Sequence, residues 1–154
     1  MAAVVELKSW AKYWLPVLLW LAVIFSGSGD VLSARQTSRF VEPLLRWLLP
    51  GASEATVRRL HGVIRKGGHV TEYGVLALLV WRARRWPRRG EPRPWRWADA
   101  GFALAFAALY AVSDELHQAF VSTRTASIID VLWDSAGALL ALGLAWGWQR
   151  WRGR

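Results

Sequence analysis

Cysteine is absent from this 154-residue chain, methionine occurs once, and acidic residues are scarce beside basic ones. Without cysteine the chain can form no disulfide bond, no thiol nucleophile and no thiolate metal site. With 20 Lys and Arg against 11 Asp and Glu, its formal net charge is +9. A basic balance of this size is typical of nucleic-acid binding, of an anionic membrane surface as partner, or of the cytoplasmic loops of a membrane protein.

The chain also lacks long uninterrupted apolar runs. Its four charge-free blocks have 17, 9, 14 and 15 residues and cover Tyr13–Gly29, Tyr73–Trp81, Ala100–Ser113 and Ser135–Gln149. Crossing the hydrocarbon core of a bilayer takes about 20 helical residues. The second block therefore reaches that length only by including His69 and Glu72, and the fourth only by including Asp130 and Asp134.

Tryptophan, in contrast, is abundant. Indole rings concentrate at the membrane–water interface, and basic side chains extend to the same level. Blocks such as "FALAFAALYAV" are apolar on every helical face, whereas the helices of a small soluble bundle carry a polar stripe. The sequence thus predicts an all-α, polytopic membrane protein with a bundle of four transmembrane helices, and it argues against nucleic acid as a partner. Nine of the twelve tryptophans mark the ends of apolar blocks beside Lys or Arg: Trp10, Trp14, Trp81, Trp86, Trp95, Trp97, Trp146, Trp148 and Trp151.

The basic residues predict an orientation in the cell membrane. Positive charges gather on the cytoplasmic side, and the basic loop 82–97, the basic tail 149–154 and the N-terminal Lys8 and Lys12 all fall on one side of a four-span chain. Both termini are therefore predicted to be cytoplasmic, although the opposite loop, Asp30–Gly68, carries seven basic residues against three acids. The first block could also be a cleaved signal peptide, but "FSGSGD" is a poor cleavage site and we expect a retained helix.

The first extracytoplasmic loop is expected to contain helices of its own. "SRFVEPLLRWLLP" has the spacing of a short amphipathic helix on the outer surface or of a re-entrant piece. "SEATVRRLHGVIRK" predicts a second loop helix with Ser53 as its N-cap. We expect one domain over residues 1–154, with its core at about 13–148.

Polar residues are predicted to converge at the outer ends of these helices. A carboxylate at the bilayer centre costs about 2.5–3.5 kcal/mol, so such residues face the bundle interior or a wet cavity. We interpret the set as a functional cluster; the alternative is a buried network that fixes helix register. Spacings of three or four residues place the members on shared helical faces, and the set comprises Lys66, His69, Tyr73, Asp114, Glu115, Gln118, Arg124 and Asp130.

These segments resemble the VanZ-like family. "RKGGHVTEYGVLALL" and "YAVSDELHQAFVSTRTASIIDVLWDSAGALLAL" follow its order of a Lys-x-x-His-x-x-x-Tyr segment, a Ser-Asp-Glu-x-x-Gln segment, an Arg, and an Asp before a small-residue helix. The resemblance implies a small polytopic protein of the cell envelope that is associated with glycopeptide (teicoplanin) susceptibility. Relatives often have Asn at the position of Asp134, so the resemblance assigns that residue no role.

For the chemistry, the leading hypothesis is a transferase or hydrolase that acts on an envelope lipid with a phosphate or similar anionic head group. His69 would be the general base or nucleophile, with Asp114 or Glu115 orienting its other ring nitrogen. Asp130 would hold Arg124 or act as a second acid or base.

Four residues are predicted to bind the substrate of this reaction. Lys66 and Arg124 would hold the anion, while Tyr73 and Gln118 would supply hydrogen bonds. No cofactor is predicted, because a divalent metal on Asp114, Glu115 and a histidine would lack a recognised ligand spacing.

Two other classes of function remain open at this point. The cluster could bind a lipid-linked wall precursor or a lipoglycopeptide without catalysis, or its charges could only mediate helix contacts in a transporter or scaffold. The predicted partners are the bilayer and a membrane lipid or lipid-linked precursor.

Overall fold

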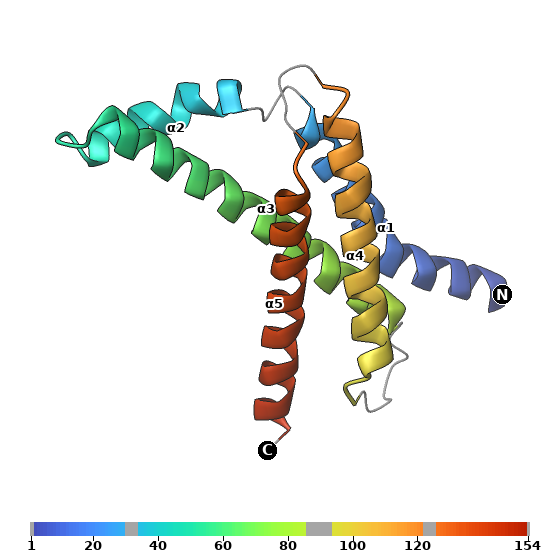
Figure 1. Cartoon of the computed structure of the whole chain (residues 1–154). Helices are drawn as coiled ribbons and strands as arrows, with labels where there is room; N and C mark the ends of the chain where they lie inside the picture. The colour runs from blue at the N-terminus through green and yellow to red at the C-terminus, as the bar shows by residue number, and fades with distance from the viewer. Residues whose placement is uncertain (1, 30–33, 86–93, 122–125, 154) are drawn as a thin grey trace.

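In a computed structural model of the chain, residues 2–29, 34–85, 94–121 and 126–153 are described, and they fold into helices with no strand among them (Figure 1). The predicted all-α class is confirmed. The five helices of these ranges are α1 (Ala2–Ser28), α2 (Ala34–Leu48), α3 (Glu54–Arg84), α4 (Trp97–Gln118) and α5 (Ile128–Arg152).

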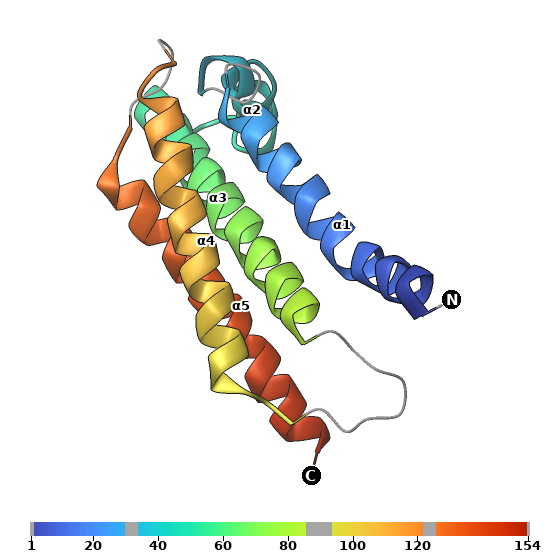
Figure 2. The ribbon, with the colours of Figure 1, turned by 90° about the vertical axis from the view of Figure 1, so that its right-hand side faces the viewer.

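The central element is α3. It packs against each of the other four helices, whereas α2 contacts only α3 within the described ranges. In Figure 2, α2 lies at the end where α1 and α4 finish and α5 begins, and Figure 1 shows α3 crossing α5 at a steep angle. The chain termini lie away from that end (Figure 2).

Two predicted helix boundaries were wrong. The first helix starts at Ala2 and not with the charge-free block at Tyr13, so Pro16 lies in the helix interior. The loop helix predicted to start at Ser53 continues through Gly67 and Gly68 into the next span and forms the 31-residue α3. Each glycine destabilises a helix by only about 1 kcal/mol. This cost is too small to break α3, which packs against other helices both before and after Gly67 and Gly68. Ser53 is the N-cap, as predicted, and accepts a hydrogen bond from the backbone N–H of Thr56 at 3.2 Å.

By length and composition, two of the described helices could cross a membrane: Trp10–Ser28 near the N-terminus and Ile128–Arg152. Signal sequences and the core helices of soluble proteins can meet the same two criteria. The observation therefore gives two candidate spans and weak evidence for membrane association, and it does not establish the predicted four-span bundle.

The bundle has an apolar core, but it also buries acids and exposes many large apolar side chains. The carboxylates of Asp134 and Asp114 are buried, with relative exposures of 0% and 4%. On the same α5, Leu140 and Leu144 are 58% and 67% exposed. The apolar side chains thus form much of the outer surface, while acids lie between the helices.

The contact between α3 and α5 is unusually close at Gly137. A Cβ atom placed on Gly137 would overlap the backbone of Val70 and come within 2.8 Å of its Cα atom. Gly74 faces the same crossing, where an added Cβ would lie 3.3 Å from the Gly137 carbonyl oxygen. Small residues let two helix backbones approach in this way. His69 precedes Val70 and Asp134 lies one turn before Gly137, so the crossing brings these two side chains together.

Replacing Gly137 by Ala should lower the melting temperature of the detergent-solubilised protein strongly. Backbone atoms cannot yield to the new methyl group, and such overpacking costs about 1–3 kcal/mol or more. Gly143→Ala is the matched control on the same helix, because a Cβ there meets nothing within 4 Å. That control should be neutral or slightly stabilising, since Ala is the better helix former. Equal melting temperatures for the two variants would contradict the close crossing.

Candidate functional site

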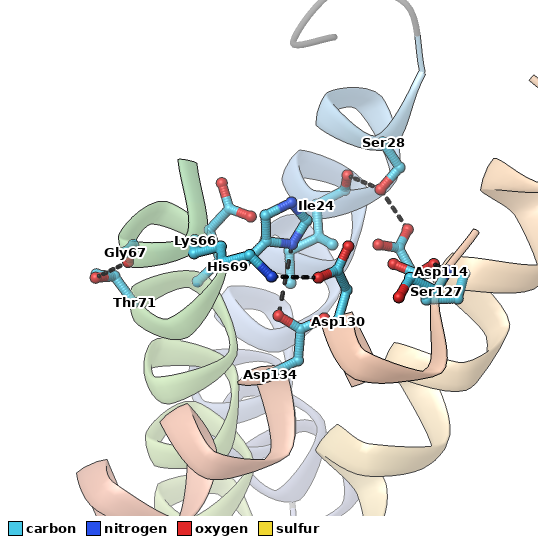
Figure 3. Close-up of polar contacts among 12 residues, drawn as sticks. Ile24, Ser28, Lys66, Gly67, His69, Thr71, Asp114, Ser127, Asp130 and Asp134 are labelled. Carbon is cyan, nitrogen blue, oxygen red and sulfur yellow. Dashed lines mark hydrogen bonds and ion pairs between the residues drawn. The ribbon is translucent and has the colours of Figure 1, made fainter. Parts of the chain in front are cut away.

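The predicted site residues gather at one end of the bundle, where α1 and α4 finish, α5 begins and α3 passes through its middle (Figure 3). Of the eight, Arg124 lies outside the described residues. The other seven come from three helices: Lys66, His69 and Tyr73 from α3, Asp114, Glu115 and Gln118 from α4, and Asp130 from α5.

The histidine of this site is paired with an aspartate. The Nδ1 atom of His69 lies 3.5 Å from an Oδ1 oxygen of Asp134, whose side chain is wholly buried (Figure 3). His69 is 23% exposed and lines a cavity. The distance is that of an ion pair, and neither His69 Nδ1 nor either Asp134 oxygen makes a hydrogen bond with a described residue. With Nδ1 on the Asp134 side, Nε2 is the ring nitrogen left to act on a ligand. A histidine beside a buried acid at the wall of a cavity has the composition of a general-base site.

Asp114 is held by two other side chains. The Ser28 hydroxyl lies between the Asp114 carboxylate and the Ile24 carbonyl oxygen, which is 2.9 Å away (Figure 3). The Gln118 side-chain amide donates to the second Asp114 oxygen at 3.0 Å. All three polar side chains are buried. The carboxylate thus connects the end of α1 to α4.

Glu115 and Ser127 join α4 to the start of α5. One Glu115 oxygen accepts a hydrogen bond from the backbone N–H of Ser127 at 2.6 Å. Ser127 is the N-cap of α5, and its hydroxyl accepts from the backbone N–H of Ile129 at 3.2 Å. Glu115 therefore satisfies one of the backbone donors that a helix start leaves open.

Lys66 and Asp130 form the most exposed pair of the site. The Lys66 Nζ atom is 3.0 Å from an Asp130 oxygen, and it also lies 5.7 Å from the ring centroid of Trp133. The two side chains are 49% and 35% exposed. An ion pair this open to solvent contributes about 0–1 kcal/mol, so it can exchange partners when a ligand arrives.

Two roles expected from the sequence do not fit these contacts. Neither Asp114 nor Glu115 orients His69; Asp134 occupies that position, because the Gly137 crossing turns this face of α5 toward α3. Tyr73, predicted to bind the substrate, is wholly buried, and its hydroxyl makes no hydrogen bond with any described residue. Tyr73 thus lies behind the site rather than on its surface.

A cavity of about 180 Å³ lies beside His69, between the end of α1, α2 and the middle of α3. Its wall includes Ser28, Thr37, Arg65 and Glu72. Asp134, Ser28 and Arg65 were all absent from the predicted set. The sequence does place Ser28 and Asp134 at the polar ends of the predicted helices, with Asp134 four residues after Asp130. It does not identify Asp134 as the partner of His69 or Ser28 as the partner of Asp114. The spacing of four between Arg65 and His69 was the signal for Arg65. No group of three or more potential metal ligands occurs within the described ranges.

Ser28→Ala should destabilise the protein, and Ser26→Ala should not. Loss of the Ser28 hydroxyl removes a donor from a buried carboxylate, which costs about 1–3 kcal/mol. Ser26 is exposed and donates only to the Ala22 carbonyl of its own helix at 2.7 Å. Thermal unfolding in detergent measures both variants, and matching losses would show that Ser28 does not hold Asp114.

Comparison with known proteins agrees with the order of the motifs. The family model described as VanZ/LLP1 matches residues 13–149, which is nearly the whole chain. No match was found among curated proteins or among solved structures. A match of this extent, together with the ordered Lys66–His69, Asp114–Glu115–Gln118 and Asp130 segments, means that the chain belongs to the VanZ/LLP1 family.

Proposed function

We propose that the protein is a multi-pass protein of the cell membrane with α1, α3, α4 and α5 as its four spans and the site at the outer interface. The exposed apolar side chains support this placement, because a surface rich in exposed Leu side chains must be covered by lipid or by another chain.

The basic end of the bundle supports the proposed orientation. Guanidinium groups there stack on aromatic rings: Arg82 lies 4.8 Å from the ring centroid of Tyr13, Arg85 lies 4.5 Å from that of Trp81, and Arg152 lies 4.9 Å from that of Trp148. Arginine and tryptophan together are typical of the cytoplasmic membrane interface. Both termini are then cytoplasmic, and α2 lies on the outer surface.

Single cysteines test this topology cleanly, because the natural chain has none. Gly51→Cys lies in the exposed turn between α2 and α3, and Gly153→Cys lies at the exposed end of α5. In intact cells a membrane-impermeant maleimide should label only the first, and the second should react after permeabilisation. The opposite pattern, or labelling of both in intact cells, would contradict the proposed orientation.

For the activity, we propose an enzyme that transfers or hydrolyses an anionic, phosphate-bearing head group of an envelope lipid. The observation that carries this proposal is the His69–Asp134 pair at the wall of a small cavity. His69 Nε2 would remove the proton of a water molecule or an acceptor hydroxyl as its oxygen attacks phosphorus. The bond from phosphorus to the leaving oxygen then breaks, and the imidazolium returns its proton to that oxygen.

The other charged residues would hold the substrate. Lys66 and Arg124 are proposed to contact the anion, and Asp130 would position Lys66, to which it is already bonded at 3.0 Å. Asp114 and Glu115 would act indirectly, because their contacts fasten α1 and α5 to α4. Membership in the VanZ/LLP1 family links the protein to resistance. We propose that the link to glycopeptides runs through a changed lipid-linked envelope component.

The size of the cavity beside His69 supports a small head group as its ligand. Pockets for drug-sized ligands have about 300–1,000 Å³. The cavity beside His69 has about 180 Å³, which is below that range and suits a head group.

His69→Gln should abolish turnover of the substrate lipid, with a loss of at least about a hundredfold, the usual minimum contribution of a general base. His117→Gln is the matched control, because His117 stacks on Phe25, with ring centroids 4.6 Å apart, and does not line the cavity. Mass spectrometry of an envelope lipid extract, incubated with each purified protein, measures the conversion.

Failure of the wild type to convert any lipid would overturn the enzymatic proposal. If a lipid then co-purifies with the wild type and is lost from Lys66→Ala or Arg124→Ala, the site is a binding site without catalysis. A loss of activity in His117→Gln equal to that in His69→Gln would show that the effect is not specific to the His69–Asp134 pair.

A further inference from the structure

Arg65 is a cation of the site that neither the sequence motifs nor the proposed mechanism uses. It lies on α3 one turn before His69, and both residues line the cavity beside α2. A spacing of four residues places their side chains on the same helical face. Lys66, the next residue, turns instead toward α5, where it bonds Asp130.

The guanidinium of Arg65 is partly buried, and one of its nitrogens has no hydrogen-bond partner among the described residues. Its Nη1 atom is inaccessible to solvent and makes no hydrogen bond, and Arg65 forms no ion pair with any described residue. A buried donor without an acceptor costs free energy, more so when it is charged. The acid whose charge acts on Arg65 is Asp130, and the carboxylate of Asp130 is already bonded to Lys66.

The cavity has room for the missing acceptor. Its other charged wall residue is Glu72, seven residues after Arg65 and therefore about 10.5 Å further along the helix at 1.5 Å per residue. An anion at the Arg65 end lies next to His69 and toward the end of the cavity wall away from the Glu72 backbone. The cavity volume of about 180 Å³ admits a phosphate-sized group, and the apolar Val41 and Ile64 on the wall suit the first carbons of a lipid.

We propose that Arg65 is the anion-binding residue of this cavity and that its ligand is a phosphate monoester, held bidentately by the guanidinium beside His69. The inference rests on the proposed function, because it places the phosphate of that substrate. The new element is a subsite between α1, α2 and α3 whose cation is Arg65. The proposed mechanism had assigned anion binding to Lys66 and Arg124.

Binding of phosphatidic acid tests the subsite without requiring turnover. The full chain in detergent is titrated with phosphatidic acid or with phosphatidylcholine, and native mass spectrometry measures retention of each lipid. Arg65→Gln should weaken phosphatidic acid binding about tenfold or more, while Arg59→Gln, an exposed arginine of the same helix, should stay within about twofold of wild type. Competition by inorganic phosphate distinguishes the two sources of the ligand: displacement at low concentration assigns the subsite to the free ion, and weak displacement assigns it to the lipid.

A second pair of variants tests the cavity even if the Arg65→Gln protein does not fold. Gly68 lines the cavity, and neither Gly68 nor Gly67 has any atom within 4 Å of an added Cβ. Gly68→Leu should therefore fill the cavity and abolish binding, whereas Gly67→Leu, which does not line it, should bind as wild type. Equal binding by Arg65→Gln and wild type, or equal losses in Gly68→Leu and Gly67→Leu, would overturn the subsite.

The outcomes also separate the subsite from the catalytic proposal. Binding that depends on Arg65 in a protein that converts no lipid would keep the subsite and reject the enzyme. Conversion that is unaffected by Arg65→Gln would keep the enzyme and reject the subsite.

Discussion

The close crossing of α3 and α5 at Gly137 is the constraint on which the site depends. A Cβ atom at this position would overlap the Val70 backbone, so the two helices meet backbone to backbone. Both contacts that join α3 to α5 in the site, His69 with Asp134 and Lys66 with Asp130, lie within two turns of this crossing. A shift of α5 would lengthen both of these contacts. The geometry of the site therefore depends on Gly137, a residue without a functional side chain.

The buried carboxylates of this bundle lie beside polar groups from other segments. Asp134 meets His69 of α3, Asp114 meets Ser28 of α1, and Glu115 meets the backbone of Ser127 before α5. Each contact offsets the cost of placing an acid in a region of low polarity. The same contacts join the helices to one another, so folding and assembly of the site are a single event.

Much of the site could be predicted from the sequence, and the failures have a common cause. Helical spacing was enough to place Lys66 and His69 near one face of α3, and the motif order was enough to indicate the family. The partner of His69 was predicted wrongly as Asp114 or Glu115, because spacing within one helix says nothing about how another helix is rotated against it. Asp134 lay outside the motif, and Arg65 lay beside a more prominent lysine.

The sequence by itself determined that this protein is helical, that its apolar blocks are too short to span a bilayer without polar residues, and that its basic residues gather beside tryptophan. These properties follow from composition and from spacing along the chain, which are local. Only the tertiary structure decided which acid meets His69, that Tyr73 is buried behind the site, and that Arg65 faces a cavity between α1, α2 and α3. Those outcomes depend on the rotation and approach of helices distant in sequence, which here are governed by a glycine that packs against a backbone.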